Sequence, residues 1–90
     1  MNAEKQRLTV LNRLSAEYPS CVSLEEIRKD THLKEHEFKR VVAYLQEKAF
    51  IELENVKQGV DGVFGEARIT AAGLDFIENR SRQVRATIIR

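Results

Sequence analysis

The first part of the chain alternates apolar and polar residues at helical spacing. Its apolar positions are Leu8, Leu11, Leu14 and Tyr18, with Val10 beside them. Charged and amide residues fill the positions between, so the pattern predicts an amphipathic helix from about Ala3 to Glu17. Pro19 sets the end of this helix, because a proline pushes the residue before it out of the helical region. Residues 20–22 are expected to form a short extended link.

A helix start signal follows this link. In Ser23-Leu24-Glu25-Glu26 the serine and the glutamate three residues later match a capping box, in which each side chain satisfies a backbone N–H group. A second helix is therefore predicted to begin at Leu24 and to bury Leu24 and Ile27. It should be short, because residues 30–32 are weak helix formers, and a tight corner near residues 31–34 should point Leu33 inward.

From Glu35 the helical spacing resumes and predicts a third helix, Glu35 to Lys48. Its apolar stripe consists of Phe38, Val41, Val42, Leu45 and Ala49. Polar residues occupy the other positions, so one face of this helix should be exposed.

The pattern then changes to that of a hairpin. Residues 50–56 alternate imperfectly, residues 57–65 supply three of the four glycines, and residues 67–69 are extended again. A three-residue loop, Val60-Asp61-Gly62, would place Leu53 opposite Ile69 and Glu54 opposite Arg68. A two-residue Asp61-Gly62 turn would instead set a glutamate against Ile69, so the three-residue loop is preferred.

A last helix is predicted from Ala71 to about Asn79. Thr70 is its expected N-cap, and Leu74, Ile77 and Phe76 are its expected buried residues. Val84 and Ile88 continue the same apolar line at heptad-like spacing. Residues 81–90 are therefore either an extension of this helix, which would suit a homodimer through the C-terminal helix, or a basic tail.

The order of elements resembles that of the winged-helix superfamily, a helix-turn-helix followed by a β-hairpin wing. The resemblance covers about residues 3–80. It is carried by Ser23-Leu24-Glu25-Glu26-Ile27, by Leu33, by Phe38, Val42 and Leu45, by Ala49-Phe50-Ile51, and by Arg68-Ile69-Thr70-Ala71-Ala72-Gly73. The last run is similar to the exit from the wing in small prokaryotic regulators of this superfamily. The resemblance implies an α+β, mostly α fold: a three-helix core, a two-stranded wing and a C-terminal helix, with residues 1–80 as one domain.

The resemblance also implies binding to double-stranded DNA, with the third helix in the major groove and the wing on the backbone. A transcriptional regulator, as a dimer on two half-sites, is the implied function. The candidate DNA-binding residues are Lys34, His36, Lys39, Arg40 and Tyr44 on the helix, with Lys57 and Gln58 on the wing. Lys39 and Arg40 are the main candidates, because Lys neutralises phosphate and Arg can also bind guanine through two hydrogen bonds.

Two features favour a different function, a protein-interaction module that does not bind DNA. Glu35 and Glu37 in the first turn of the third helix would repel phosphate. The wing tip carries three apolar residues that suit a protein contact: Val60, Val63 and Phe64.

Composition and charge fit one domain. The chain has 90 residues, 42% apolar and 32% charged, which is within the globular range. Residues 1–79 carry 11 Lys and Arg against 14 Asp and Glu, whereas residues 80–90 add four Arg and no acid. The basic end could bind phosphate without sequence preference. No run is apolar enough for a membrane span and the N-terminal residues lack a signal region, so a cytoplasmic location is expected.

No motif indicates an enzyme, a cofactor or a metal site. The segment from His36 to Arg40 lacks the second histidine of a zinc-protease helix. The glycines do not form a phosphate-binding loop, because no Gly-Lys-Ser/Thr sequence is present. Cys21 is the only cysteine, which excludes an intrachain disulfide and fits a reducing compartment.

Overall fold

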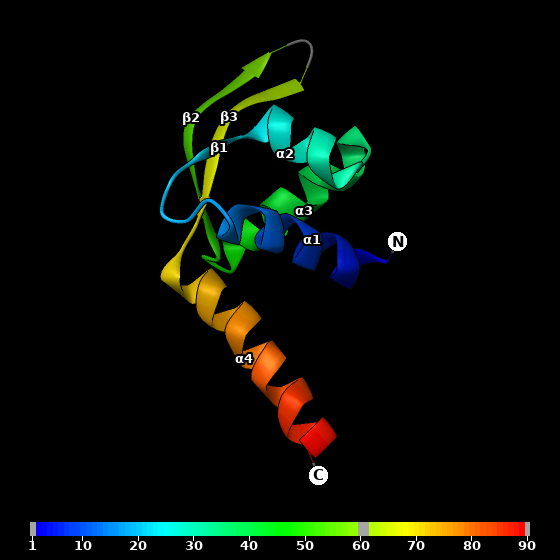
Figure 1. Ribbon diagram of the computed structural model, residues 1–90. Coiled ribbons are helices and arrows are strands. Elements are labelled where there is room, and N and C mark those ends of the chain that lie inside the picture. The colour runs from blue at the N-terminus through cyan, green and yellow to red at the C-terminus, as the bar shows by residue number, and fades with distance from the viewer. Residues whose placement is uncertain (1, 60–61, 90) are drawn as a thin grey trace.

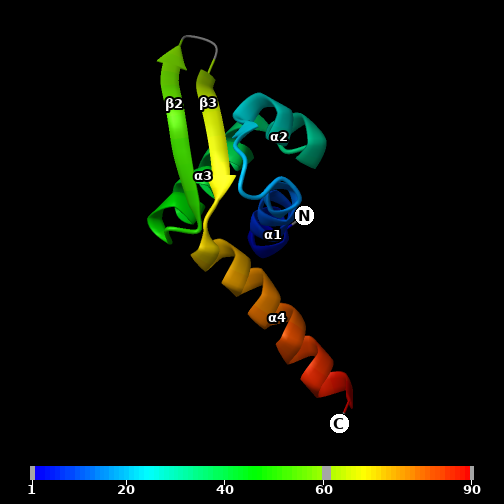
Figure 2. The same ribbon diagram turned by 60° about the vertical axis from the view of Figure 1, so that its left-hand side comes forward.

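The fold is α+β and mostly helical, with a small antiparallel sheet. A computed structural model describes the backbone of residues 2–59 and 62–89 and the side chains of residues 2–57 and 64–80. The elements follow in the order α1 (Ala3–Ser15), β1 (Val22–Ser23), α2 (Leu24–Thr31), α3 (Glu35–Glu47), β2 (Ile51–Gly59), β3 (Gly62–Ile69) and α4 (Ala71–Ile89) (Figure 1). The hairpin β2–β3 and helix α4 extend from the three-helix body in opposite directions (Figure 2).

The core lies between helices α1 to α3 and one face of the sheet. The largest fully buried side chains are Leu11, Leu14, Ile27, Leu45, Ile69 and Val10. The helical stripes predicted from the sequence supply most of these residues, and Phe38, Val41 and Leu33 are buried with them. Tyr18, predicted to continue the stripe of α1, is instead 43% exposed because α1 ends at Ser15. Ala49 is also exposed, since it follows the end of α3 with a positive φ of 60°.

Helix α2 begins at Leu24 as predicted, but the predicted capping box is wrong. The side chain of Ser23 makes no capping hydrogen bond, and its backbone is extended because Ser23 belongs to strand β1. Val22 and Ser23 pair with Ala67 and Glu66 of β3, so the expected link forms a third strand. The sheet order is therefore β1-β3-β2.

The hairpin register differs from the prediction by two residues. Ile69 faces Ile51 rather than Leu53, and Arg68 faces Glu52 rather than Glu54. One residue of this shift arises because Gly62 pairs with Gly59 in the sheet, whereas the prediction had placed Gly62 in a three-residue loop. Val60 and Asp61 of the predicted loop lie outside the described residues. The other arises from a β-bulge between Glu54 and Lys57. A shift of two keeps each side chain on its predicted face.

The bulge requires glycine at position 65. Asn55 has a φ of 53°, and Gly65 on the opposite strand has a φ of 148°. A Cβ atom on Gly65 would approach both the carbonyl oxygen of Glu54 and the Cα of Val56 to 3.0 Å. Only glycine combines this backbone conformation with such close contact.

Helix α4 begins at the predicted cap and extends to Ile89. The hydroxyl of Thr70 accepts a hydrogen bond of 3.1 Å from the backbone N–H of Gly73, and it donates one of 2.7 Å to the carbonyl of Ala49. Leu74 and Ile77, which were predicted to be buried, are only half-buried. Phe76, also predicted to be buried, is 39% exposed and stacks on Phe50 at 4.9 Å between ring centroids. Within the part of the chain that the structure describes, no helix is long and apolar enough to cross a membrane.

Candidate nucleic-acid interface

The exposed face of α3 carries the main candidates predicted from the sequence. Helix α3 buries Phe38, Val41 and Leu45, which leaves His36, Lys39 and Arg40 exposed. The Lys39 ammonium lies 3.6 Å from the Glu35 carboxylate one turn earlier, with both side chains more than half exposed. Such a pair contributes only a few tenths of a kcal/mol, so it does not prevent Lys39 from contacting a phosphate.

Glu37, the second acid that the sequence placed on this face, is directed away from it. Its Oε1 accepts a hydrogen bond of 3.0 Å from the backbone N–H of Lys34, and its Oε2 accepts one of 2.9 Å from the side-chain amide of Gln6 in α1. The backbone hydrogen bond is the main reason why the pKa of Glu37 is lowered; the bond from Gln6 and the charge of His36 add to this effect. The carboxylate therefore caps α3 and joins it to α1.

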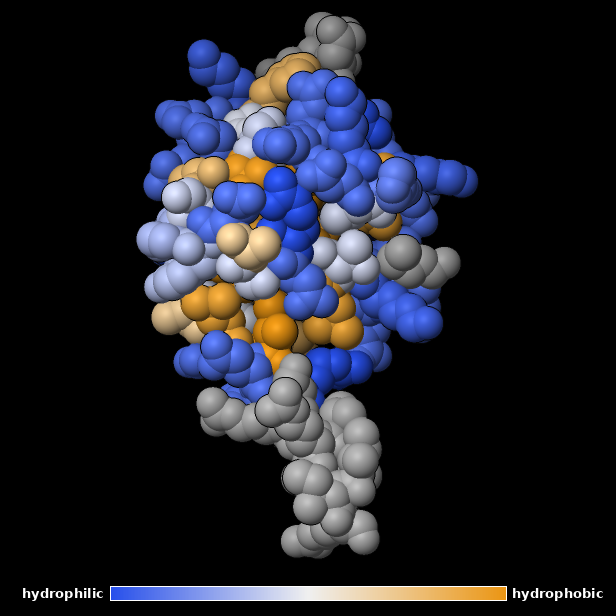
Figure 3. Space-filling model, viewed as in Figure 1, coloured by the Kyte–Doolittle hydropathy of each residue, from blue (hydrophilic) through white to orange (hydrophobic). Residues whose placement is uncertain are grey.

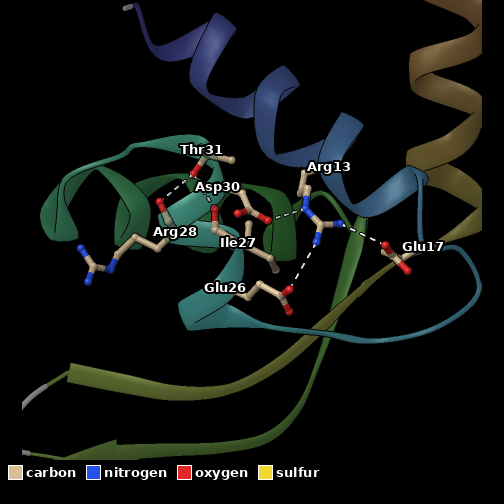
Figure 4. A network of polar contacts seen from close by, with 7 residues as sticks. All are labelled: Arg13, Glu17, Glu26, Ile27, Arg28, Asp30 and Thr31. Carbon is tan, nitrogen blue, oxygen red and sulfur yellow. Dashed lines mark hydrogen bonds and ion pairs between the residues drawn. The ribbon is translucent and has the colours of Figure 1, made fainter.

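Two acids of α2, Glu26 in its first turn and Asp30 in its last, are also directed toward α1. The Arg13 guanidinium lies 2.8 Å from Asp30, 3.8 Å from Glu26 and 3.5 Å from Glu17 (Figure 4). The hydrogen bond with Asp30 is the largest cause of the raised pKa of Arg13. This network fixes α2 against α1 and uses two of the negative charges of α2.

Two basic residues of α2 were missed by the sequence analysis. Arg28 and Lys29 are exposed, and Arg28 points away from the Arg13 network (Figure 4). In the sequence, only their position just before the corner between the second and third helices indicates that they could belong to the binding surface. Among the described side chains, Arg28, Lys29, Lys34 and Arg40 form no ion pair.

Residues 28–40, here called the basic segment, thus have an uneven surface charge. The segment contains five Lys and Arg and three acids. Two of those acids, Asp30 and Glu37, contact Arg13 and Gln6 of α1. Glu35 is the remaining acid, and it is exposed beside Lys39. The exposed charge of the basic segment is therefore positive although residues 1–79 as a whole are mildly acidic.

Tyr44 lies one helical turn after Arg40 on α3, and its ring contacts α1. The Arg7 guanidinium of α1 is 3.9 Å from the centroid of its ring, and the Lys48 ammonium is 5.9 Å from it. The ring is therefore occupied by a contact between α1 and the C-terminal part of α3. Tyr44 therefore follows Arg40 along the helix, but its ring is engaged by Arg7.

The hairpin contributes one described cation without an ion pair, and two exposed apolar side chains. Lys57 is exposed and lies opposite Phe64 in the sheet. Val56 and Phe64 are 42% and 45% exposed, which is high for apolar side chains. The side chains of Gln58 and Val63, and the whole of Val60, lie outside the described residues.

The outer face of the sheet is acidic. Arg68 forms an ion pair with Glu52, while Glu54 and Glu66 face each other across the strands. The Sγ of Cys21 donates to Glu54 at 3.5 Å. Burial is the main cause of the raised pKa of Cys21, and Glu54 raises it further. This face is unsuited to phosphate, and in the described part of the chain no three His, Cys, Asp or Glu residues converge on a metal position.

Comparison with known proteins gives no relative on which a function could be based: no family model matches the chain, and no curated protein matches it in sequence.

Proposed function

We propose that this protein is a winged-helix protein that binds double-stranded DNA as a transcriptional regulator. Helix α3 would enter the major groove, and the hairpin β2–β3 would act as the wing. The order of three helices, hairpin and final helix supports this arrangement. Because a fold alone does not determine function, the proposal depends on the chemistry of the basic segment.

One observation carries the proposal. Asp30 and Glu37 are held by residues of α1, so Glu35 is the only acid of the basic segment without a partner in α1, against five exposed Lys and Arg. Affinity for DNA comes largely from Lys and Arg side chains that neutralise phosphates. The local excess of positive charge therefore matters more than the net charge of the whole chain.

The exposed basic residues of the basic segment and Lys57 of the hairpin each have a role in this proposal. Arg40 would contact a base edge or a phosphate, because its guanidinium can donate two parallel hydrogen bonds. Lys34, His36 and Lys39 would contact phosphates beside the groove, and Arg28 and Lys29 would extend this contact along the backbone. Lys57 is placed to contact the backbone from the wing.

A dimer is part of the proposal, since a single helix in one groove gives limited affinity and two half-sites are usual. Helix α4 is the proposed dimer contact. The side chains of residues 81–90, including the three arginines that would add phosphate contacts, lie outside the described residues.

The experiment is a titration of labelled random duplex DNA with the protein at several salt concentrations, followed by fluorescence anisotropy. The proposal predicts binding at low salt that weakens steeply as salt increases, because bound cations release counterions from the DNA. Absence of binding at low salt would disprove it.

Protein binding through the hairpin is the second candidate function. The exposed Val56 and Phe64 favour it, since exposed large apolar side chains on a projecting hairpin can form a partner site. The change Phe64→Ser should then release the partners that co-purify with the protein. Retention of every partner would exclude this function for the hairpin.

A further inference from the structure

A groove lies between α1, α3 and the beginning of α4, away from the basic segment. Its volume is about 270 Å³, and its apolar lining includes Leu8, Leu11, Phe50 and Phe76. Apolar surface gathers low on the body, next to α4, in the view of Figure 3. The stacked rings of Phe50 and Phe76 form one end of this lining, so the groove can accept an aromatic group.

Two cations lie at the edge of the groove. Arg7 and Lys48 both line it, and both lie near the ring of Tyr44, which belongs to the same lining. Neither cation forms an ion pair within the described part of the chain. The one acid in the lining, Glu4, is paired with Arg80 of α4. The groove therefore combines an apolar floor with a positive edge.

This combination identifies the chemistry of the occupant. An apolar groove with a few directed polar groups is the usual form of a small-molecule site, and sites for drug-sized ligands begin at about 300 Å³. A groove of 270 Å³ suits one or two rings. A second copy's C-terminal segment is disfavoured, because residues 80–90 contain four arginines and no acid and would be repelled by Arg7 and Lys48.

We propose that this groove binds a small aromatic carboxylate, with the ring on Leu8, Phe50 and Phe76 and the carboxylate between Arg7 and Lys48. The site uses the C-terminal part of α3 and α1, whereas the proposed DNA contact uses residues 28–40. The two proposals are independent and can fail separately.

The first experiment compares two matched probes, 2-naphthoate and its neutral amide, 2-naphthamide. Each is titrated into the ¹⁵N-labelled protein, and the backbone amide resonances are followed by NMR. The carboxylate should shift the resonances of Leu8, Tyr44, Phe50 and Phe76 to saturation. The amide should bind about tenfold more weakly, because it lacks the charge-assisted contacts with Arg7 and Lys48.

The second experiment removes the cations. The double variant Arg7→Gln with Lys48→Gln should lose the preference for the carboxylate, while Arg28→Gln with Lys29→Gln, which changes the net charge equally at another surface, should keep it. Equal binding of both probes to the unchanged protein, or no saturable shift at the groove, overturns the proposal. The comparison of the two probes on the unchanged protein tests the proposal even if the double variant at Arg7 and Lys48 does not fold.

Discussion

The side-chain amide of Gln6 donates a hydrogen bond of 2.9 Å to the carboxylate of Glu37, and this contact joins α1 to the first turn of α3. Gln6 is buried, so its amide is held in place for this bond. The carboxylate also caps α3 through the backbone N–H of Lys34. The Glu37 carboxylate thus stabilises the start of α3 and is directed toward α1.

The lowered pKa of Glu37 predicts a pH dependence of stability. A carboxylate whose pKa is lower in the folded protein stabilises the fold above its ordinary pKa, about 4.3, and this contribution is lost as the pH falls through the folded value. Glu37→Gln should therefore unfold at lower urea concentration than the unchanged protein at neutral pH, and the difference should diminish in acid. Glu35→Gln is the control. A difference that stays constant with pH would contradict the assigned role of Glu37.

The Arg13 network predicts a moderate loss of stability when the guanidinium is removed. Arg13→Gln breaks contacts with Asp30, Glu26 and Glu17, and its side chain is only 23% exposed. Urea unfolding should show a loss of about 1 kcal/mol, at the upper end for partly exposed pairs because several charges converge. Arg28→Gln, which removes an exposed cation without an ion pair, should change the unfolding free energy by less than about 0.5 kcal/mol. Equal effects of both changes would show that the network does not stabilise the fold.

Gly73→Ala should be strongly destabilising. A Cβ atom at this position would lie 2.4 Å from the carbonyl oxygen of Phe50 and 2.7 Å from Cγ1 of Ile69, so α4 would have to move away from the core. We expect a loss of about 2 kcal/mol or more in urea unfolding, as for other overpacked sites. Ala72→Ser, at the neighbouring exposed position, should have an effect below about 0.5 kcal/mol. A Gly73→Ala protein of unchanged stability would show that α4 does not pack against Phe50 as described.

The raised pKa of Cys21 predicts slow alkylation. Only the thiolate reacts with iodoacetamide, and burial together with the hydrogen bond to Glu54 lowers its population at a given pH. Glu54→Gln should lower the thiol pKa and speed up the reaction, whereas the distant Glu47→Gln should not. The rate is followed by mass spectrometry at about pH 8, near the ordinary pKa of cysteine. An unchanged or slower rate in Glu54→Gln would refute the contact.

The helices and the corner could be predicted from the sequence, because apolar periodicity reports burial directly. The buried stripe Phe38, Val41 and Leu45 and the cap at Thr70 are examples. The capping box at Ser23 was wrong, since pairing with β3 holds this residue in a strand that is too short to show alternation. The hairpin register depended on a bulge at Asn55, whose positive φ leaves no clear pattern in the sequence.

The part of the candidate site that could be predicted from the sequence is the set of basic residues whose exposure follows from the helical periodicity. His36, Lys39 and Arg40 lie on the exposed face opposite the predicted stripe. The directions of Glu37 and Asp30 were not predictable, because each depends on a partner in α1 that lies 17 or more residues away in the chain. Tyr44 was grouped with Lys39 for the same reason. The contact of its ring with Arg7 depends on how α1 packs against α3, which the sequence does not show.

The central claim is that the exposed cations of the basic segment bind DNA, and charge reversal on α3 tests it most directly. Arg40→Glu and Lys48→Glu change the net charge equally, but Arg40 lies on the proposed contact face while Lys48 lies beside Tyr44 next to the groove. Binding to the same duplex at low salt is measured by fluorescence anisotropy for both variants and for the unchanged protein. The proposal predicts that Arg40→Glu weakens binding about tenfold or more and lowers the salt dependence, with a much smaller effect of Lys48→Glu. Equal weakening by both changes, or full binding by Arg40→Glu, would contradict it.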